Sequence, residues 1–199
     1  RAGRIRRAGL DADSQLNLDL VNYVGESVLE EERIRPEHMP VTNIGGPQYW
    51  LPQLASFVSF SKPKDYEDYV TRLALIPEHL AQHISAMREG MEAGRVPPKV
   101  VITPAIAQAK SQAMASFVER PETNPFYKPF LAVEDRYPAL AKRARSLISS
   151  EINDAYAEIA AFLEDEYQPA CRETCGITQG IDGARAYEIA IKKYTTLDM

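Results

Sequence analysis

The stretch DYEDYVTRLALIPEHLAQHISAMREGMEAGRVPP, residues 65–98, contains the pattern that decides the fold class. Apolar residues recur in it every three or four positions, which is the spacing of one buried helical face. Pro77 interrupts the pattern and removes a backbone donor, so we expect the helix to kink or break there. A second helical stretch ends at Gly94, because Pro97-Pro98 prevents its continuation. The two predicted apolar faces contain Tyr66, Tyr69, Val70, Leu73, Ile76, Leu80, Ile84, Met87 and Met91.

The same helical period runs through most of the remaining chain, and no segment shows the strict alternation of a strand. The sequence therefore predicts an all-α fold: a multi-helix, bundle-like array with proline-rich connecting loops, forming one part of a larger helical fold. In residues 13–31 we expect one buried stripe, made of Leu16, Leu20, Tyr23, Val24 and Val28. Further helices are expected from Tyr49 to Phe60, from Thr103-Pro104 to Arg120, from Pro138 to Tyr167 and from Asp182 to Tyr194.

Length and charge restrict the possible classes. A chain of 199 residues fits one domain or two small helical subdomains. Its formal net charge of −5 argues against a general nucleic-acid surface. Four of the first seven residues are Arg, so residues 1–12 are interpreted as a basic cut end, more in keeping with the surface of an interrupted helix than with a nucleic-acid arm. No apolar run approaches the length of a membrane span, and no signal peptide is present.

The two cysteines do not define a metal site. Cys171 and Cys175 have the spacing that stacks side chains on one helix face, with Gly176 as the residue that ends the helix. Two thiols cannot complete a four-ligand zinc site on their own. We expect two packed thiols rather than a strained local disulfide, and the cysteines therefore do not identify the compartment.

His79 and His83 are the only histidine pair with metal-ligand spacing on a helix. The peptidase version of this pattern needs Glu directly after the first histidine, because that carboxylate activates the metal-bound water. Here that position is Leu80, and His38 lies in a proline-bounded loop, so no third ligand is indicated. We interpret the pair as solvated or hydrogen-bonding side chains and predict neither a metal ligand nor a catalytic residue.

Other catalytic patterns are absent, but the aromatic residues give a weaker functional signal. There is no Gly-x-Ser-x-Gly turn, and the loop 43–47 lacks the Lys-Ser/Thr of a phosphate loop. Aromatic side chains near the loops could line a groove for peptide side chains, or they could plug the joints between helices. The residues in question are Tyr49, Trp50, Phe126, Tyr127, Phe130, Tyr187 and Tyr194.

Several segments, taken in order, resemble a known bacterial family, and their order and spacing are more specific than any single motif. Over roughly residues 13–199 the chain resembles the N-terminal half of the family called domain of unknown function eight-eight-five. The segments are Gly46-Pro47, Asp65-Tyr66-Glu67, Tyr69 with Arg72-Leu73, Ile76-Pro77, Arg88-Glu89-Gly90 with Gly94 and Pro97, Asn124 to Phe130, Glu166 to Arg172, and Tyr187 with Tyr194-Thr195-Thr196.

The resemblance implies a longer, largely helical bacterial protein that looks like a zinc metallopeptidase. The family's metal-binding segment, of the type His-Glu-x-x-Pro-Gly-His, would lie downstream of Tyr194, so none of its ligands is carried over onto this sequence. Zinc is therefore expected only in the missing downstream part, and no cofactor is expected in these residues. The implied partners are that missing C-terminal half and a peptide substrate, with no nucleic acid and no membrane span. The compartment would be the cytoplasm, or an exported location if a signal lies upstream.

The leading hypothesis is a helical portion of a zinc-peptidase-like protein that contributes a wall or lid of a peptide-binding cleft. The alternative is a free-standing helical binding domain without catalytic activity. An isolated half should also expose an apolar face that normally packs on its partner.

Overall fold

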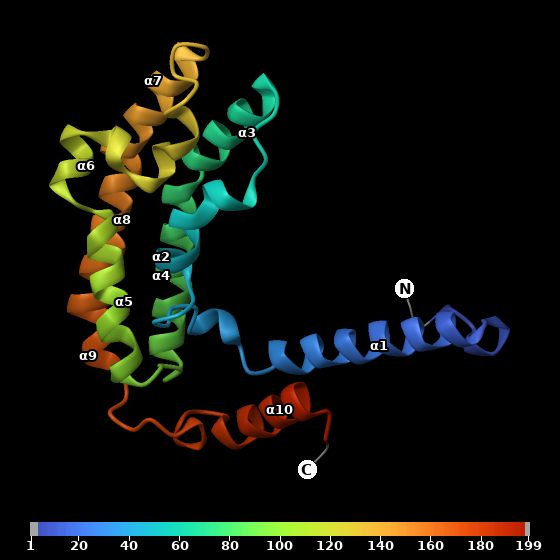
Figure 1. Cartoon of the computed structure of the whole chain (residues 1–199). Coiled ribbons are helices and arrows are strands. Elements are labelled where there is room, and N and C mark those ends of the chain that lie inside the picture. Colours follow the sequence, from blue (N-terminus) through green and yellow to red (C-terminus); the bar gives the residue numbers. More distant parts are fainter. Residues whose placement is uncertain (1–3, 198–199) are drawn as a thin grey trace. The chain divides into compact units, whose positions relative to one another are not determined.

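The computed structural model describes residues 4–197 and is built of helices (Figure 1). Within that range the only extended pairings are two isolated bridges, Thr42 with Gly45 and Pro98 with Arg172, and there is no sheet. The predicted all-α class is confirmed. The chain divides into two compact units, which we call the terminal unit (Arg1–Pro36 with Gly176–Met199) and the central unit (Glu37–Cys175). No helix in the described range is long and apolar enough to cross a membrane.

The central unit begins with short elements and continues with long helices. A chain of helical segments runs without a break from Pro138 to Ala170, with single π-helical turns inside it. This confirms the predicted long helix that begins at Pro138. The elements are α2 (Pro47–Trp50), η4 (Leu51–Phe57), α3 (Pro63–Ala74), α4 (Ile76–Glu92), α5 (Lys99–Gln112), α6 (Ala115–Glu119), η5 (Pro121–Thr123), η6 (Pro125–Phe130), α7 (Pro138–Leu147), η7 (Ile148–Ile152), α8 (Asn153–Phe162), η8 (Leu163–Tyr167) and α9 (Gln168–Ala170).

The junction between α3 and α4 follows the sequence prediction. The Asp65 carboxylate accepts hydrogen bonds from the backbone N–H groups of Ser61 (2.8 Å) and Lys62 (3.0 Å), which fixes the start of α3. The first helix ends at Ala74, and Pro77 lies in the first turn of α4, where its missing donor costs no helical hydrogen bond.

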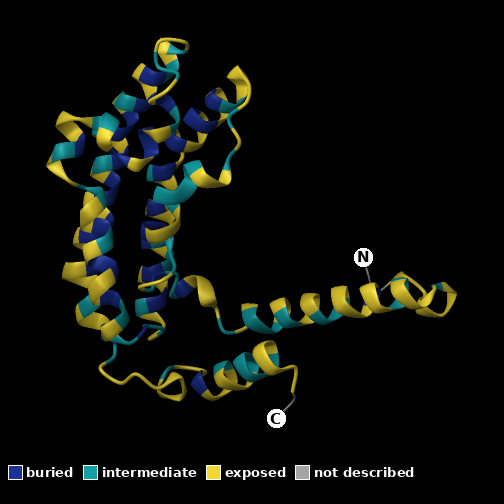
Figure 2. Ribbon diagram, viewed as in Figure 1, coloured by how far each residue is buried: buried dark blue, intermediate teal, exposed yellow. Residues whose placement is uncertain are grey.

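The hydrophobic core belongs entirely to the central unit, as the buried residues in Figure 2 show. Helix α8 packs against both α4 and α5. Three buried tyrosines hold distant backbone oxygens in this core: Tyr69 donates to Phe126 O (2.9 Å), Tyr156 to Pro47 O (3.4 Å) and Tyr167 to His38 O (3.4 Å). These bonds satisfy the hydroxyl groups that burial would otherwise leave without water.

The terminal unit contains α1 (Ala12–Glu32), α10 (Gly183–Thr195) and two short 3₁₀ segments, η2 (Arg7–Gly9) and η9 (Ile177–Gln179). The prediction of a buried stripe on α1 is wrong. Tyr23 is half-buried, but the other four stripe residues are 50–58% exposed, namely Leu16, Leu20, Val24 and Val28. The reason is that α10 contacts α1 around Tyr23, Ser27 and Glu30, and this contact leaves the other stripe positions uncovered.

Two further predictions about helix ends are wrong. Helix α5 begins at Lys99 and not at Thr103, and Pro104 lies inside it on the exposed face. It ends at Gln112 and not at Arg120, and α6 follows as a separate short helix. The cysteines do not share a helix face either, because α9 ends at Ala170. Cys171 is extended and buried, whereas Cys175 is exposed in the following loop, and both are free thiols.

Candidate functional site

The candidate site is a hollow of about 550 Å³ between η4 and η6 in the central unit. We call it the η4–η6 groove. Its walls are formed by prolines and by Phe60, and its rim carries a few polar groups. The lining residues are Pro52, Gln53, Ala55, Ser56, Phe60, Pro125, Lys128 and Pro129.

Buried side chains behind the groove fix the position of η6. The Asn124 side chain accepts a hydrogen bond from the backbone N–H of Phe126 (3.0 Å), which turns the chain into η6. The Tyr69 hydroxyl donates to the carbonyl oxygen of Phe126 at 2.9 Å. The ring of Phe130 packs near Tyr66, with 5.7 Å between centroids. The groove wall is therefore attached to the core rather than carried on a loose loop.

The lining suits an apolar group joined to an acidic one. Phe60, in edge contact with Tyr69 (5.2 Å between centroids), gives the groove an aromatic wall. Lys128 is exposed on the rim and has no ion-pair partner among residues 4–197. An ammonium in that position can attract a carboxylate, while the prolines and Phe60 cover an apolar side chain. The one hydroxyl side chain among the lining residues, that of Ser56, donates to the carbonyl oxygen of Gln53 at 2.7 Å.

The sequence comparison gives the family. Residues 1–199 match the family described as "Bacterial protein of unknown function (DUF885)". The chain belongs to this family. No curated protein and no solved structure matches it.

The aromatic residues named from the sequence lie in different places in this DUF885 chain. Phe126, Tyr127 and Phe130 are fully buried, so they support the groove from behind and do not line it. Tyr49 and Trp50 are partly exposed on α2 in edge contact (4.9 Å between centroids) but lie outside the groove. The remaining two lie in the other unit, on the exposed side of α10; they are Tyr187 and Tyr194.

Of the segments that the sequence named for a groove, the run after Asn124 borders this hollow, but its aromatic side chains do not line it. The aromatic run after Asn124 does form one wall, but Pro125 and Pro129 face the hollow. Burial raises the pKa of the Tyr127 hydroxyl to about 12, and the Arg145 guanidinium lies 4.6 Å from the centre of its ring. Phe60 lines the groove but was not among the residues named from the sequence. Its position at the end of the predicted helix 49–60, just before Pro63, was the available sequence signal.

The histidine pair on α4 forms a contact of its own. Nε2 of His79 and Nε2 of His83 are 3.2 Å apart, so one ring donates a hydrogen bond to the other. Burial, and secondarily the neighbouring His79, lowers the pKa of His83 below its ordinary value. Among the residues that the structure describes, no three His, Cys, Asp or Glu side chains could hold a metal ion together. The described residues of this DUF885 chain therefore do not fit a zinc site.

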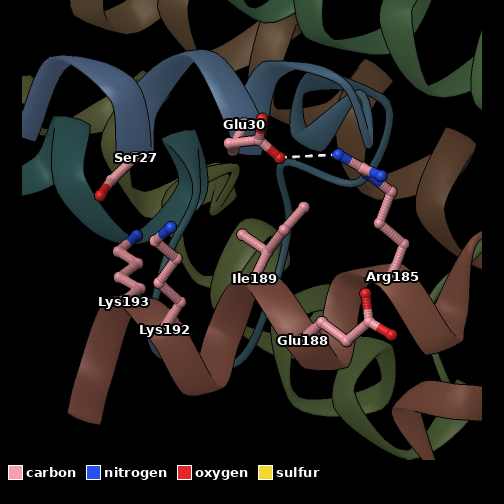
Figure 3. Close-up of a pocket in the computed structure, with 7 residues that line it drawn as sticks. All are labelled: Ser27, Glu30, Arg185, Glu188, Ile189, Lys192 and Lys193. Carbon is pink, nitrogen blue, oxygen red and sulfur yellow. Dashed lines mark hydrogen bonds and ion pairs between the residues drawn. The ribbon is translucent and has the colours of Figure 1, made fainter. Parts of the chain in front are cut away.

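A second hollow, of about 150 Å³, lies between α1 and α10 in the terminal unit (Figure 3). Arg185 and Glu30 form an ion pair across it at 2.7 Å, and Ile189 points from α10 toward α1. Lys193 is paired with Glu31 at 2.8 Å, which raises the pKa of the Lys193 ammonium. Ser27 donates to the carbonyl oxygen of Tyr23 (2.8 Å) and is not activated as a nucleophile. This hollow is a packing seam between two helices.

Proposed function

We propose that this chain is the helical part of a protein resembling zinc-dependent peptidases. In this proposal it contributes one wall of a peptide-binding cleft and does not itself carry the metal site. The zinc and its ligands would lie outside these 199 residues. The observation that carries the proposal is the η4–η6 groove, because it combines an apolar wall with a single unpaired cation at its rim.

The groove predicts a preference that can be tested with short peptides. A peptide that ends in phenylalanine should place its ring against Phe60 and its terminal carboxylate near Lys128. Exposed ion pairs contribute up to about 1 kcal/mol, so the free carboxylate should bind about fivefold more tightly than the matching C-terminal amide. Nuclear magnetic resonance titration of the full chain measures both affinities and maps the binding residues.

Matched lysine variants sharpen this test. Lys128→Ala should abolish the difference between carboxylate and amide, while Lys142→Ala, an exposed lysine outside the groove, should leave it unchanged. Peptide signals that map away from η4 and η6 would count against the groove. Zinc-dependent cleavage of a mixed peptide library by this chain alone would refute the proposed division of roles.

A second candidate function is a helical binding domain that acts without catalysis. It is favoured by the central unit, which holds its own complete hydrophobic core and the whole groove. Both candidates require peptide binding in the groove. They differ in whether a downstream segment with a His-Glu motif is part of the same protein, which the coding sequence after Met199 would decide.

A further inference from the structure

Helix α1 carries a row of exposed apolar side chains, inclined to the helix axis, that nothing in the described part of the terminal unit covers. Leu16, Leu20, Val24 and Val28 follow one another at four-residue steps, and neighbours at this spacing lie side by side on a helix surface. Each of the four side chains is at least half exposed. Figure 2 shows this exposure along most of α1. A contiguous exposed apolar surface of this kind marks an interaction site more often than a solvated face.

Acidic residues close the ridge at both ends. Asp13 lies one turn before Leu16, and Glu32 lies one turn after Val28. Neither carboxylate has an ion-pair partner in the described part of the chain. We call the row from Asp13 to Glu32 the α1 ridge. The whole of α1 contains six acidic residues and no basic residue: Asp13, Asp19, Glu26, Glu30, Glu31 and Glu32.

The terminal unit already shows what packs on α1. Helix α10 lies along it, with Ile189 pointing toward α1 and Arg185 paired to Glu30 across the gap (Figure 3). Arg185 pairs with Glu30 at 2.7 Å, and Lys193 pairs with Glu31 at 2.8 Å. At the other end of α1, Arg7 pairs with Asp19 at 2.9 Å. All three contacts bring a basic group to an acidic helix.

We propose that the α1 ridge docks a second basic amphipathic helix, supplied by a protein partner. Its apolar side would cover Leu20 and Val24, and its Lys or Arg side chains would pair with Asp13 and Glu32, as α10 does with Glu30 and Glu31. Charge decides against two other occupants. The α1 helix of a second copy would bring like charges together, and an anionic membrane surface would be repelled by the same carboxylates.

Two synthetic helical peptides with the same leucine face test the proposal on the full chain. One has lysine at its polar positions, and its twin has glutamate. By fluorescence anisotropy at low salt, the lysine peptide should bind at least about tenfold more tightly than the glutamate twin, and added salt should weaken it. The double variant Leu20→Asn with Val24→Asn should lose this binding.

Leu29→Asn is the matched control, because Leu29 is 66% exposed but lies about 140° around the helix from Val24. It should retain binding of the lysine peptide. All substituted residues are exposed, and circular dichroism verifies that α1 stays helical. Val24→Thr, which keeps the shape of valine, should weaken binding less than the double variant and provides a second readout if that variant loses helicity.

Several results would overturn the proposal. Equal binding of both peptides would show that charge is not recognised. Equal loss in the Leu29→Asn and ridge variants would show that binding is not at the ridge, and so would full binding by the double variant. Self-association that the double variant abolishes, without peptide binding, would make a second copy the occupant. Binding to anionic vesicles through the ridge would make the occupant a membrane. The inference does not rest on the η4–η6 groove, since Lys128→Ala should leave binding of the lysine peptide unchanged.

Discussion

Because Gly90 has no side chain, the backbone segments at His38 and Arg95 can approach it closely. A Cβ atom built on Gly90 would lie 2.7 Å from the carbonyl oxygen of His38 and 3.0 Å from that of Arg95. Both contacts are to backbone atoms, which cannot rotate away. Gly90→Ala gains about 1 kcal/mol of helix propensity, but we expect the clash to outweigh it, with a net loss of about 1–3 kcal/mol in the free energy of unfolding. Urea denaturation measures this loss.

Gly25 in α1 is the matched control for that substitution. A Cβ atom at Gly25 meets nothing within 4 Å, and the residue is exposed within the helix. Gly25→Ala should therefore leave stability unchanged or raise it by up to about 1 kcal/mol. A Gly90→Ala protein as stable as the native chain would show that His38 moves aside without cost.

His83 provides a pH-dependent prediction. Its folded pKa is lowered by burial first and by His79 second, so the neutral ring is favoured in the folded state. The unfolded chain then binds more protons as the pH falls through the ordinary histidine range, and stability should decrease there. Ring titration by nuclear magnetic resonance should place the pKa of His83 below the usual value. His79→Gln should raise it only in part, because the burial remains. A pKa of His83 at or above the ordinary value would contradict the assignment.

These residues also mark a limit of sequence reasoning. The sequence predicted that His79 and His83 are solvated or hydrogen-bonding side chains, and in the structure their rings are hydrogen-bonded to each other. The sequence singled out Arg88-Glu89-Gly90 as a motif, but the reason for Gly90 is a carbonyl oxygen from His38, far away along the chain. Periodicity describes neighbours within one element and carries no information on such contacts between elements.

At the scale of elements, α5 offers the clearest prediction. Pro104 lies inside this helix on its exposed face, where it lacks the N–H that would bond to the carbonyl oxygen of Val100. Pro104→Ala restores that donor and removes the steric clash of the proline ring with the preceding helical turn. It also makes the unfolded chain more flexible, which opposes part of the gain. We expect a net gain of about 1–2 kcal/mol in the free energy of unfolding. Ala107→Ser, on the exposed face of the same helix, is the control and should change stability little. A loss of stability in Pro104→Ala would mean that α5 depends on the shape that proline gives it.

Proline signals placed the helix ends correctly at one site and wrongly at another. Pro77 lies in the first turn of α4, as the sequence indicated. Helix α5 instead begins earlier, because the backbone N–H of Lys99 donates to the carbonyl oxygen of Arg172 (2.8 Å) and anchors the start. The apolar stripe on α1 differs from this. Its three-to-four-residue spacing correctly predicted a helix, but apart from Tyr23 the stripe is exposed because no described element of the terminal unit packs on it. The local sequence pattern thus predicted which segments are helical. Contacts between the helices determine where each helix ends and which of its faces are exposed.

At the scale of the whole molecule, the two units differ in how much apolar surface they bury. Among the described residues of the terminal unit, only Leu18 and Gly183 are buried, whereas the core cluster runs from Val41 to Cys171 in the central unit. The sequence allowed one domain or two helical subdomains, and composition could not decide between them because apolar residues are spread along both. The two units differ because the apolar helix faces of the central unit pack against other helices, whereas most of those in the terminal unit do not.

We therefore expect residues 37–175 alone to fold and to unfold cooperatively, because they keep every member of the core cluster. Thermal unfolding followed by circular dichroism tests this. In the full chain, hydrogen exchange should show less protection in α1 and α10 than in α4 and α8, since exposed helices open at lower free energy. Matching protection in all four helices would mean that the α1 ridge is covered in solution, and an unfolded 37–175 chain would mean that the central core needs the terminal unit.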